Sequence, residues 1–352
     1  MTTTERLPGY DTQRVEAWIE DHVSGLRPPL TWSWIEGGHS NLTYRLEDES
    51  GNVAVIRRPP LGKLLPKAHD MSREWALISA LGPTAVPVPE ALGFCEDVDV
   101  TGAHFYVMEF VEGHVLYGAN DTERWMPKAS RMNFARTFID VLAELHALDP
   151  DAVGLGDLGK KENYVGRQLK TWYRSWNASI EGAEFDDPRA HTLQEYFLAN
   201  MPEQGPAKVV HGDYSVHNIL TTSEGAVAAV LDWEISTLGD PLADLAYALN
   251  QWPDESDSVP PRQEMATSAP GFPGRREMAR WYAERTGRDL SMLDYYAGFN
   301  RWKTAAITHG VYARYMAGQK STKGVDLEGL RKIVEHSLTL AEQAVERLEN
   351  AT

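Results

Sequence analysis

The sequence feature that most restricts the possible folds is a polar segment followed by a short apolar hairpin. Residues 211–218 read His-Gly-Asp-Tyr-Ser-Val-His-Asn, and residues 219–231 consist of two largely apolar runs separated by Ser-Glu-Gly. Glycine supplies the positive φ that a tight turn needs, so the two runs are predicted to pair as antiparallel strands. Because a hairpin brings its ends side by side, Asp213 and Asn218 at its entrance are expected to face Asp232 at its exit.

These two acids and the amide are the side chains that phosphoryl transfer requires. One carboxylate accepts the proton of the acceptor hydroxyl, while an amide and a second carboxylate hold Mg²⁺ against the phosphates of ATP. Protein kinases space these residues as Asp, four residues and Asn, with a second Asp after a hairpin. We therefore predict Asp213 as the catalytic base and Asn218 and Asp232 as Mg²⁺ ligands. The alternative is a polar loop beside a buried strand.

The same motif departs from the protein-kinase pattern at two places. Gly212 replaces the arginine before the first acid, and Trp233-Glu234 replaces the Phe-Gly that follows the second. With these residues the segment resembles the aminoglycoside phosphotransferase and choline kinase-like family of small-molecule kinases. The resemblance implies an α+β, bilobal, protein-kinase-like fold with a small N-terminal antiparallel-sheet lobe and a larger, mainly helical C-terminal lobe. It also implies ATP and Mg²⁺ as cofactors and a small-molecule phosphate acceptor.

A second segment narrows this resemblance. Residues 57–70 read Arg-Arg-Pro-Pro-Leu-Gly-Lys-Leu-Leu-Pro-Lys-Ala-His-Asp. They are similar to the kinase-like domain fused to some eukaryotic acyl-CoA dehydrogenases and to its bacterial stand-alone relatives. That subgroup is implied to phosphorylate hydroxylated acyl compounds rather than antibiotics, so the family name describes the fold and not the substrate. We find nothing in the sequence that indicates a flavin site.

The first strands of the chain have the pattern of a nucleotide-binding lobe. Two predicted strands, residues 30–35 and 42–46, are joined by a Gly-Gly turn whose backbone amides can approach phosphate oxygens. The complete Gly-x-Gly-x-x-Gly pattern is absent, and an ordinary hairpin is the alternative. The residues predicted to contact the phosphates are Gly37, Gly38, His39 and Ser40.

An arginine on the next predicted strand stands where protein kinases carry a phosphate-binding lysine. The apolar run 53–56 ends in Arg57 and Arg58, and strand alternation favours Arg57 for the phosphates. Arg58 is the competitor, and the arginine that is not used is expected to face solvent. Glu74, on the helix predicted over residues 68–81, is a candidate ion-pair partner for this arginine. The alternative for Glu74 is a solvated surface position.

A flexible step after the strand predicted over residues 104–110 is expected to form the hinge between the lobes. A kinase-like hinge would bond adenine through backbone atoms, here those of Glu109 and Val111. The lobes are accordingly placed at residues 1–112, which bind nucleotide, and 113–352, which carry the catalytic and acceptor-binding residues. Backbone contacts leave no side-chain signature, so this prediction depends on position alone.

Three further residues are predicted to support the catalytic segment. Asp240 and Pro241 have the residue types of a helix N-terminus, which places Asp244 one turn later among apolar neighbours. A buried carboxylate needs hydrogen-bond donors, and the resemblance implies that this aspartate holds the catalytic loop. His211 is predicted to brace that loop rather than transfer protons, and Glu234 is a candidate outer metal contact.

The remainder of the C-terminal part is predicted to be mainly helical. Its apolar periodicity begins near Ser130, and two long helices over about residues 290–318 and 327–348 close the chain. His146 is expected to be a cap or core histidine rather than a catalytic group. Residues 253–273, rich in Pro, Ser and acidic residues, are predicted to form a long loop.

The charge balance limits the possible partners. The chain has 34 lysine and arginine residues against 51 aspartate and glutamate residues, a formal net charge of −17. Such a chain repels nucleic acid and anionic membranes, so neither is expected as a partner. The single cysteine, Cys95, excludes an internal disulfide and a cysteine zinc site. The sequence begins without an apolar signal region and contains no run of about 18 apolar residues, so a cytoplasmic protein is expected.

Two other functions stay open on the sequence alone. A regulatory pseudokinase would bind ATP without transferring phosphate, although every expected acid and amide is present. An acyl-CoA dehydrogenase would bind flavin and be yellow. Within the kinase interpretation, the acidic run 254–257 permits an aminoglycoside as acceptor, while C-terminal aromatic residues permit an acyl compound. The sequence does not distinguish ATP from GTP and does not predict an oligomeric state.

Overall fold

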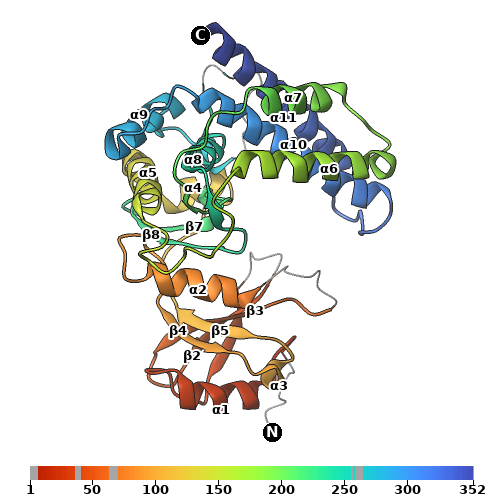
Figure 1. The fold of residues 1–352 in the computed structure, drawn as a ribbon. Coiled ribbons are helices and arrows are strands. Elements are labelled where there is room, and N and C mark those ends of the chain that lie inside the picture. The colour runs from red at the N-terminus through yellow and green to blue at the C-terminus, as the bar shows by residue number, and fades with distance from the viewer. Residues whose placement is uncertain (1–6, 36–40, 63–69, 255–256, 258–264, 352) are drawn as a thin grey trace.

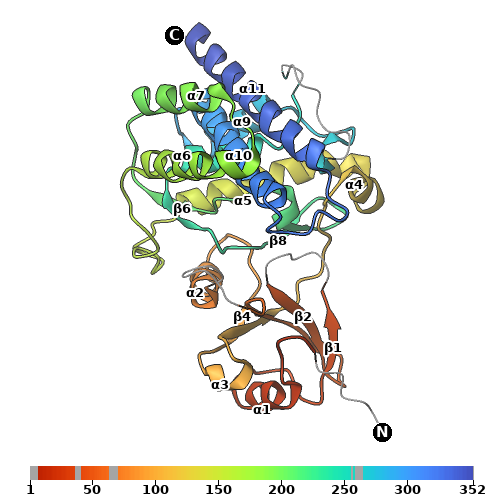
Figure 2. The same ribbon diagram turned by 90° about the vertical axis from the view of Figure 1, so that its right-hand side faces the viewer.

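The fold consists of an N-terminal part built on a sheet and a larger C-terminal part built from helices. The computed structural model describes residues 7–35, 41–62, 70–254, 257 and 265–351. Figures 1 and 2 show the sheet part below the helical part, with the N-terminus and the C-terminus at opposite ends of the molecule. The predicted α+β architecture, with a small antiparallel sheet followed by a mainly helical region, is confirmed. The division at residues 112 and 113 stays a prediction.

The N-terminal sheet has the strand order β1-β2-β3-β5-β4, and all neighbouring strands are antiparallel. Its strands are β1 (Thr31–Trp34), β2 (Leu42–Glu47), β3 (Val53–Arg58), β4 (Ala91–Cys95) and β5 (Phe105–Glu109). Successive side chains of a strand point to opposite faces. In β3, Ile56 therefore packs in one apolar cluster and Val55 in another.

One helix covers each face of this sheet (Figure 1). The helix α1 (Thr12–His22) packs on the face of Ile56, and α2 (Met71–Leu81) packs on the face of Val55. Both helices begin after an aspartate whose carboxylate accepts a backbone N–H, as an N-cap does. For α2 this cap is Asp70, so the helix starts at Met71 rather than at residue 68 as predicted.

The C-terminal part contains most of the helices. They are α4 (Ala119–Trp125), α5 (Arg131–Ala147), α6 (Tyr164–Ala183), α7 (Pro188–Ala199), α8 (Pro241–Leu249), α9 (Arg275–Thr286), α10 (Leu293–Met316) and α11 (Leu327–Ala351). The last two are the predicted long closing helices, and they pack on α6 and α7 on one side of this part, with α5 and α9 on the other (Figure 1). In the N-terminal part, a short helix, α3 (Val98–Thr101), lies between β4 and β5. None of the helices in the described ranges is both long and apolar enough to cross a membrane.

The predicted hairpin is present as β7 (Ile219–Thr221) paired antiparallel with β8 (Val227–Val230). Its turn is anchored to α5, because Thr137 donates from its hydroxyl to the Gly225 carbonyl oxygen at 2.9 Å. Gly225 has φ 80°, and a Cβ at this position would lie 2.9 Å from the Phe134 backbone nitrogen. Only glycine therefore allows the turn to approach the helix this closely.

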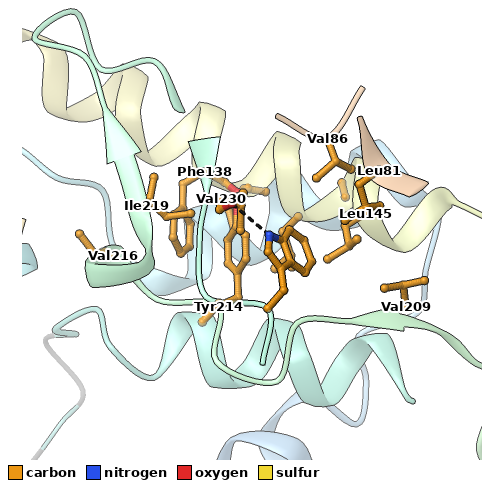
Figure 3. Close-up of a cluster of buried hydrophobic side chains, with 14 of the residues drawn as sticks. Leu81, Val86, Phe138, Leu145, Val209, Tyr214, Val216, Ile219 and Val230 are labelled. Atoms are coloured by element: carbon orange, nitrogen blue, oxygen red, sulfur yellow. Dashed lines mark hydrogen bonds between the residues drawn. The ribbon is translucent and has the colours of Figure 1, made fainter. Parts of the chain in front are cut away.

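A single apolar cluster joins the hairpin to both parts of the molecule. Figure 3 shows Ile219 of β7 and Val230 of β8 beside Phe138 of α5, with Leu81 and Val86 of the N-terminal part at one edge of the cluster. The hairpin is also tied to the chain that follows β5, because His114 and Thr221 exchange backbone hydrogen bonds of 2.9 and 3.0 Å. The core thus fixes the hairpin relative to the N-terminal sheet.

Candidate active site

The predicted catalytic segment, residues 211–218, begins where β6 (Lys208–Val210) ends, and its residues Asp213 and Asn218 lie side by side. The side-chain amide of Asn218 donates to the Asp213 carbonyl oxygen at 3.0 Å and to Asp213 Oδ2 at 3.1 Å. A turn of 3-10 helix over Val216–Asn218 returns the chain toward the acid. Because the amide nitrogen of Asn218 is engaged by Asp213, its Oδ1 atom is the one left for a ligand.

Gly212 explains why this motif lacks the arginine of protein kinases. Its φ is 83°, in the left-handed region where residues with a side chain are strained. A Cβ here would also lie 3.3 Å from the Ile235 carbonyl oxygen. The path of the loop into Asp213 therefore requires glycine at this position.

Asp244 binds two backbone N–H groups at the start of the 211–218 segment, in agreement with the supporting role that the resemblance implied. Its Oδ2 accepts the His211 backbone N–H at 2.7 Å, and its Oδ1 accepts the Gly212 backbone N–H at 2.9 Å. Burial disfavours its negative charge, but the hydrogen bond from His146 and these neighbouring donors hold the pKa of Asp244 below its usual range. His146 Nε2 lies 3.3 Å from Asp244 Oδ2, and the Tyr282 hydroxyl donates a hydrogen bond of 2.7 Å to His146 Nδ1. Burial lowers the pKa of His146, which keeps the ring neutral as a core residue.

His211 is fully buried, and both of its ring nitrogens have backbone partners. Nε2 donates to the Leu231 carbonyl oxygen at 2.9 Å, and Nδ1 accepts the Asp213 backbone N–H at 3.3 Å. These two bonds assign the proton to Nε2 and connect the start of the catalytic segment to the end of β8. The contacts agree with the predicted bracing role of His211.

Asp232 lies two residues after the end of β8 and has a left-handed backbone, φ 63°. This conformation is uncommon for residues other than glycine and is found most often for Asn, Asp and His. The preceding residue, Leu231, donates its backbone N–H to the Asn218 carbonyl oxygen at 2.8 Å, so the entrance and exit of the hairpin are adjacent. Asp232 Oδ1 accepts a hydrogen bond of 2.9 Å from the Arg57 guanidinium, which reaches it from the N-terminal sheet.

Arg57 connects two acids that belong to different parts of the chain. Besides Asp232, its Nε lies 3.3 Å from Glu74 Oε2, which is the ion pair expected from the sequence. Glu74 is buried and also accepts hydrogen bonds from the Tyr106 hydroxyl at 2.9 Å and the Asn41 amide at 3.4 Å. Although burial disfavours its charge, the two acids raise the pKa of Arg57, so the guanidinium is charged at every relevant pH.

Arg58 does not face solvent, and that expectation was wrong. Its side chain is buried and donates to the carbonyl oxygens of Gly9, Pro59 and Thr101. The alternation of β3 correctly separates the two arginines, but the segments around Gly9 and Thr101 cover the face that Arg58 occupies. Arg58 therefore binds the N-terminal segment to the sheet, and of these two arginines it is Arg57 that reaches Asp232.

The remaining predicted nucleotide contacts are placed only in part. The loop residues Gly37, Gly38, His39 and Ser40 lie outside the described residues. At the expected hinge, Glu109 donates its backbone N–H to the Glu90 carbonyl oxygen at 2.9 Å, so this amide is already used within the protein. Within the described ranges, no protein group bonds the backbone amide of Val111. Their contact with adenine stays a prediction.

The oxygen atoms at the hairpin fit a divalent metal shared with a ligand. Asn218 Oδ1 and the Asp232 carboxylate are hard oxygen donors of the kind Mg²⁺ prefers, and in nucleotide sites phosphates and water supply the other ligands. Across the described residues, no group of three His, Cys, Asp or Glu side chains is arranged to hold a metal by itself. Glu234 is half-buried, and its charge contributes to the raised pKa of Glu74, which places it near the same cluster.

Tyr247 is a site residue that sequence reasoning missed. It lies on α8, and its hydroxyl donates to Asp213 Oδ1. Burial and the neighbouring Asp213 raise the pKa of Tyr247 well above its usual value, so the phenol stays protonated and acts as a donor. A signal was present: Tyr247 follows Asp244 by three residues and therefore shares its helix face. Lys303 of α10, which lies over the Tyr247 ring, was also missed.

The two-part fold, together with the cluster of Asp213, Asn218, Asp232 and Arg57, can be compared with known protein families. A family model described as "Phosphotransferase enzyme family" matches residues 31–281, which contain the N-terminal sheet, the β7–β8 hairpin and α8. The chain belongs to this aminoglycoside phosphotransferase-type family, as the His-Gly-Asp motif implied.

Individual relatives also support the resemblance to the kinase-like domain of some acyl-CoA dehydrogenases. The chain is 33% identical over 333 residues to acyl-CoA dehydrogenase family member 11 of Rattus norvegicus, an alignment that covers 91% of this chain and 42% of the relative. The chain thus spans about two fifths of the length of the curated relatives it matches. The predicted similarity to a kinase-like domain found in acyl-CoA dehydrogenases is confirmed.

Solved structures show the same fold. A protein of Ralstonia eutropha, provisionally described as an aminoglycoside phosphotransferase, is 31% identical and superposes with a TM-score of 0.79 over 95% of this chain and 99% of that chain. An aminoglycoside phosphotransferase solved with ADP bound is 16% identical, with a TM-score of 0.57 over 94% of this chain and 98% of that chain. At that level of identity the second structure supports the kinase-like fold alone.

Proposed function

We propose that this protein is an ATP- and Mg²⁺-dependent kinase that transfers the γ-phosphate to the hydroxyl group of a small acceptor, with a hydroxyacyl compound as the favoured class. The observation that carries the proposal is the placement of Asp213, bonded to Asn218 and Tyr247, beside the exit of the hairpin. There Asp232 meets Arg57, which Glu74 holds in place. These are the base, amide, acid and cation that phosphoryl transfer uses.

In the proposed reaction the acceptor oxygen forms a bond to the γ-phosphorus while the bond from that phosphorus to the ADP oxygen breaks. Asp213 accepts the proton of the acceptor hydroxyl. Asn218 and Tyr247 each donate to one Asp213 oxygen, which orients the carboxylate and leaves a lone pair for the proton. Asn218 Oδ1 and Asp232 would hold Mg²⁺, which supplies neutralisation of phosphate charge when bound. Arg57 adds a permanent positive charge next to the phosphates.

An acceptor screen tests this proposal directly. Hydroxy acids, hydroxyacyl-CoAs and aminoglycosides are incubated with ATP or GTP and Mg²⁺, and formation of the nucleoside diphosphate is measured. Acceptor-dependent ADP formation is expected with the hydroxyacyl class. If the protein binds nucleotide but consumes none with any acceptor, it is a regulatory binding module instead. A yellow, flavin-containing preparation would contradict the kinase assignment.

The metal role of Asp232 can be separated from its ion pair with Arg57. Replacing Asp232 by Ala is expected to abolish the gain in ATP affinity that Mg²⁺ provides, a loss of at least about tenfold, or about 1.4 kcal/mol. Affinity for metal-free ATP should not fall, because the substitution removes a negative charge close to the phosphates. Calorimetric titrations with Mg²⁺ and with EDTA measure both values. An unchanged effect of Mg²⁺ in the variant would remove Asp232 from the metal site.

The two neighbouring arginines provide a matched pair of variants. Arg57→Met is expected to weaken ATP binding about 10- to 100-fold, because it removes a charge-assisted donor beside two acids. Arg58→Met should leave ATP affinity unchanged but destabilise the fold by about 3 kcal/mol, since buried carbonyl oxygens lose their donor. Calorimetry and urea unfolding distinguish the two effects. Equal loss of ATP affinity in both variants would contradict the assignment of Arg57.

A further inference from the structure

A buried lysine lies close to the carboxylate that is proposed as the catalytic base. Lys303, in the middle of α10, is only 7% exposed. Among the described residues no side chain or backbone carbonyl forms an ion pair or hydrogen bond with its ammonium group. An ammonium group that is largely withdrawn from water and left without a hydrogen-bonded counter-charge is unfavourable. The Lys303 nitrogen is not among the fully enclosed polar atoms of the described residues, so a ligand can reach it. Burial accordingly lowers the pKa of Lys303, although Asp244 and Asp213 act against that shift.

The packing of two helices fixes where this ammonium group lies. Asn300 of α10 donates its side-chain amide to the Ala243 carbonyl oxygen of α8 at 2.7 Å. About one turn further along both helices, Lys303 Nζ lies 5.8 Å from the centre of the Tyr247 ring. The hydroxyl group of the same tyrosine donates to Asp213 Oδ1. One aromatic side chain therefore separates the cation from the carboxylate that is proposed to receive the acceptor proton.

This cation serves no step of the reaction proposed above. The phosphates are assigned to Arg57 and the hairpin, and the catalytic loop is held by Asp244 and His211. The contact with the Tyr247 face is worth only about 0.5–2 kcal/mol, less than the cost of burying an unpaired ammonium group. In a chain of net charge −17, a buried cation next to the active site favours a ligand of opposite charge at that place.

We propose that Lys303 binds a carboxylate of the phosphate acceptor, so that the enzyme selects hydroxy acids over neutral and cationic acceptors. This inference rests on the proposed kinase function and names the acceptor class of the same site. The acceptor would place its hydroxyl at Asp213 and its carboxylate at Lys303, several bonds apart along one side of Tyr247. A polycationic aminoglycoside would meet the ammonium group with like charge and be excluded.

The test compares a hydroxy acid with its neutral ester. The probes are 3-hydroxyoctanoate, its methyl ester and kanamycin, with the wild-type protein, Lys303→Met and Lys303→Arg. Lys332→Met, at an exposed lysine of α11 paired with Glu328, is the matched control. Wild-type protein should prefer the acid to the ester and reject kanamycin. Lys303→Met should lose about 10- to 100-fold in kcat/KM for the acid and little for the ester. Lys303→Arg should keep the preference, and Lys332→Met should behave as wild type.

A second measurement does not depend on turnover. Calorimetric binding of 3-hydroxyoctanoate to the ADP-loaded protein should be detected for the wild type and lost in Lys303→Met. Without ligand, Lys303→Met should melt at a temperature equal to or above that of the wild type, because an unpaired buried charge has been replaced by an apolar side chain. A melting temperature clearly below that of the wild type would show that the ammonium group is paired inside the free protein and would overturn the proposal.

The other outcomes separate this inference from the proposed function. Equal losses for acid and ester would show that Lys303 only orients Tyr247, and a raised KM for ATP would show that it binds the γ-phosphate; either result overturns the inference and leaves the kinase intact. A wild-type protein that neither prefers nor binds the acid also overturns it. Binding of the acid that depends on Lys303, without phosphorylation of any acceptor, would support the anion site and contradict the kinase.

Discussion

Replacing Asp213 by Ala is expected to lower kcat about 1000-fold while ATP binding stays within about twofold of the wild type, because general-base catalysis contributes roughly 10²–10⁴-fold. Both oxygens of Asp213 are oriented by neutral side-chain donors, Tyr247 and Asn218. No cation of the protein forms an ion pair with it in the described part of the chain. It is thus free to take a proton, unlike Asp232, which Arg57 neutralises.

The measurement is steady-state turnover with the best acceptor of the screen, together with calorimetric ATP binding. Asp213→Asn is the sharper variant, because it keeps the shape of the side chain and removes only the ability to accept the proton. Asp21→Asn, at an exposed position of α1, is the matched control and should retain full activity. If Asp213→Ala turned over at the wild-type rate, Asp213 would not be the base. A loss of ATP binding equal to the loss of turnover would show that the acid binds nucleotide instead.

The second large effect is expected on stability. Asp244→Asn should lower the free energy of unfolding by about 3–5 kcal/mol, the cost of breaking a buried charged hydrogen-bond network. The wild-type carboxylate accepts the backbone N–H groups of His211 and Gly212 with separate oxygens. An asparagine offers only one acceptor oxygen and directs an amide nitrogen toward the other donor. One backbone N–H of the catalytic loop is then buried without a partner.

The dependence of this stability on pH has a definite sign. The pKa of Asp244 is lowered in the folded protein, so its contribution is complete above the unfolded value of about 3.9 and is lost as the pH falls through the folded value. His146 also makes the folded protein less stable on acidification, but over a higher pH range. Its pKa is lowered in the folded state, so below about pH 6.5 the unfolded state binds the proton more readily. Acidification should therefore destabilise the wild type, and the difference between the wild type and Asp244→Asn should shrink below about pH 4.

Urea unfolding at several pH values, followed by circular dichroism, measures both effects. Asp21→Asn again serves as the control, since its carboxylate is solvent-exposed and should change stability by less than about 0.5 kcal/mol. A loss in Asp244→Asn no greater than that of the control would mean that the catalytic loop is held by other contacts. A difference that grows on acidification would contradict the direction of the Asp244 pKa.

Local features of the site could be predicted from the sequence, because the residue preferences of turns and helix caps act over only a few residues. The hairpin from Ile219 to Val230 follows from two apolar runs around a glycine turn. The α8 start follows from Asp240 before a proline, with the Asp240 carboxylate accepting the Leu242 N–H at 2.9 Å. Strand alternation separated Arg57 from Arg58, and the helix repeat placed Asp244 on an inward face. In each case the decisive contact lies within one element or one turn.

By contrast, the contacts between elements were decided by tertiary packing. The ion pair of Arg57 and Asp232 joins residues 175 positions apart, and the Tyr247 hydroxyl reaches Asp213 across 34 positions. Periodicity states which face of an element is covered but not which segment covers it, which is why Arg58 was wrongly assigned to solvent. The same limit applies to Lys303: its burial beside Tyr247 depends on how α10 packs on α8. The sequence by itself thus determined the family and the fold class, and it located the motif that is proposed to be catalytic. Only the packing of distant elements decided which cations, donors and acids share the site, because side chains far apart in the chain meet through the core rather than through local geometry.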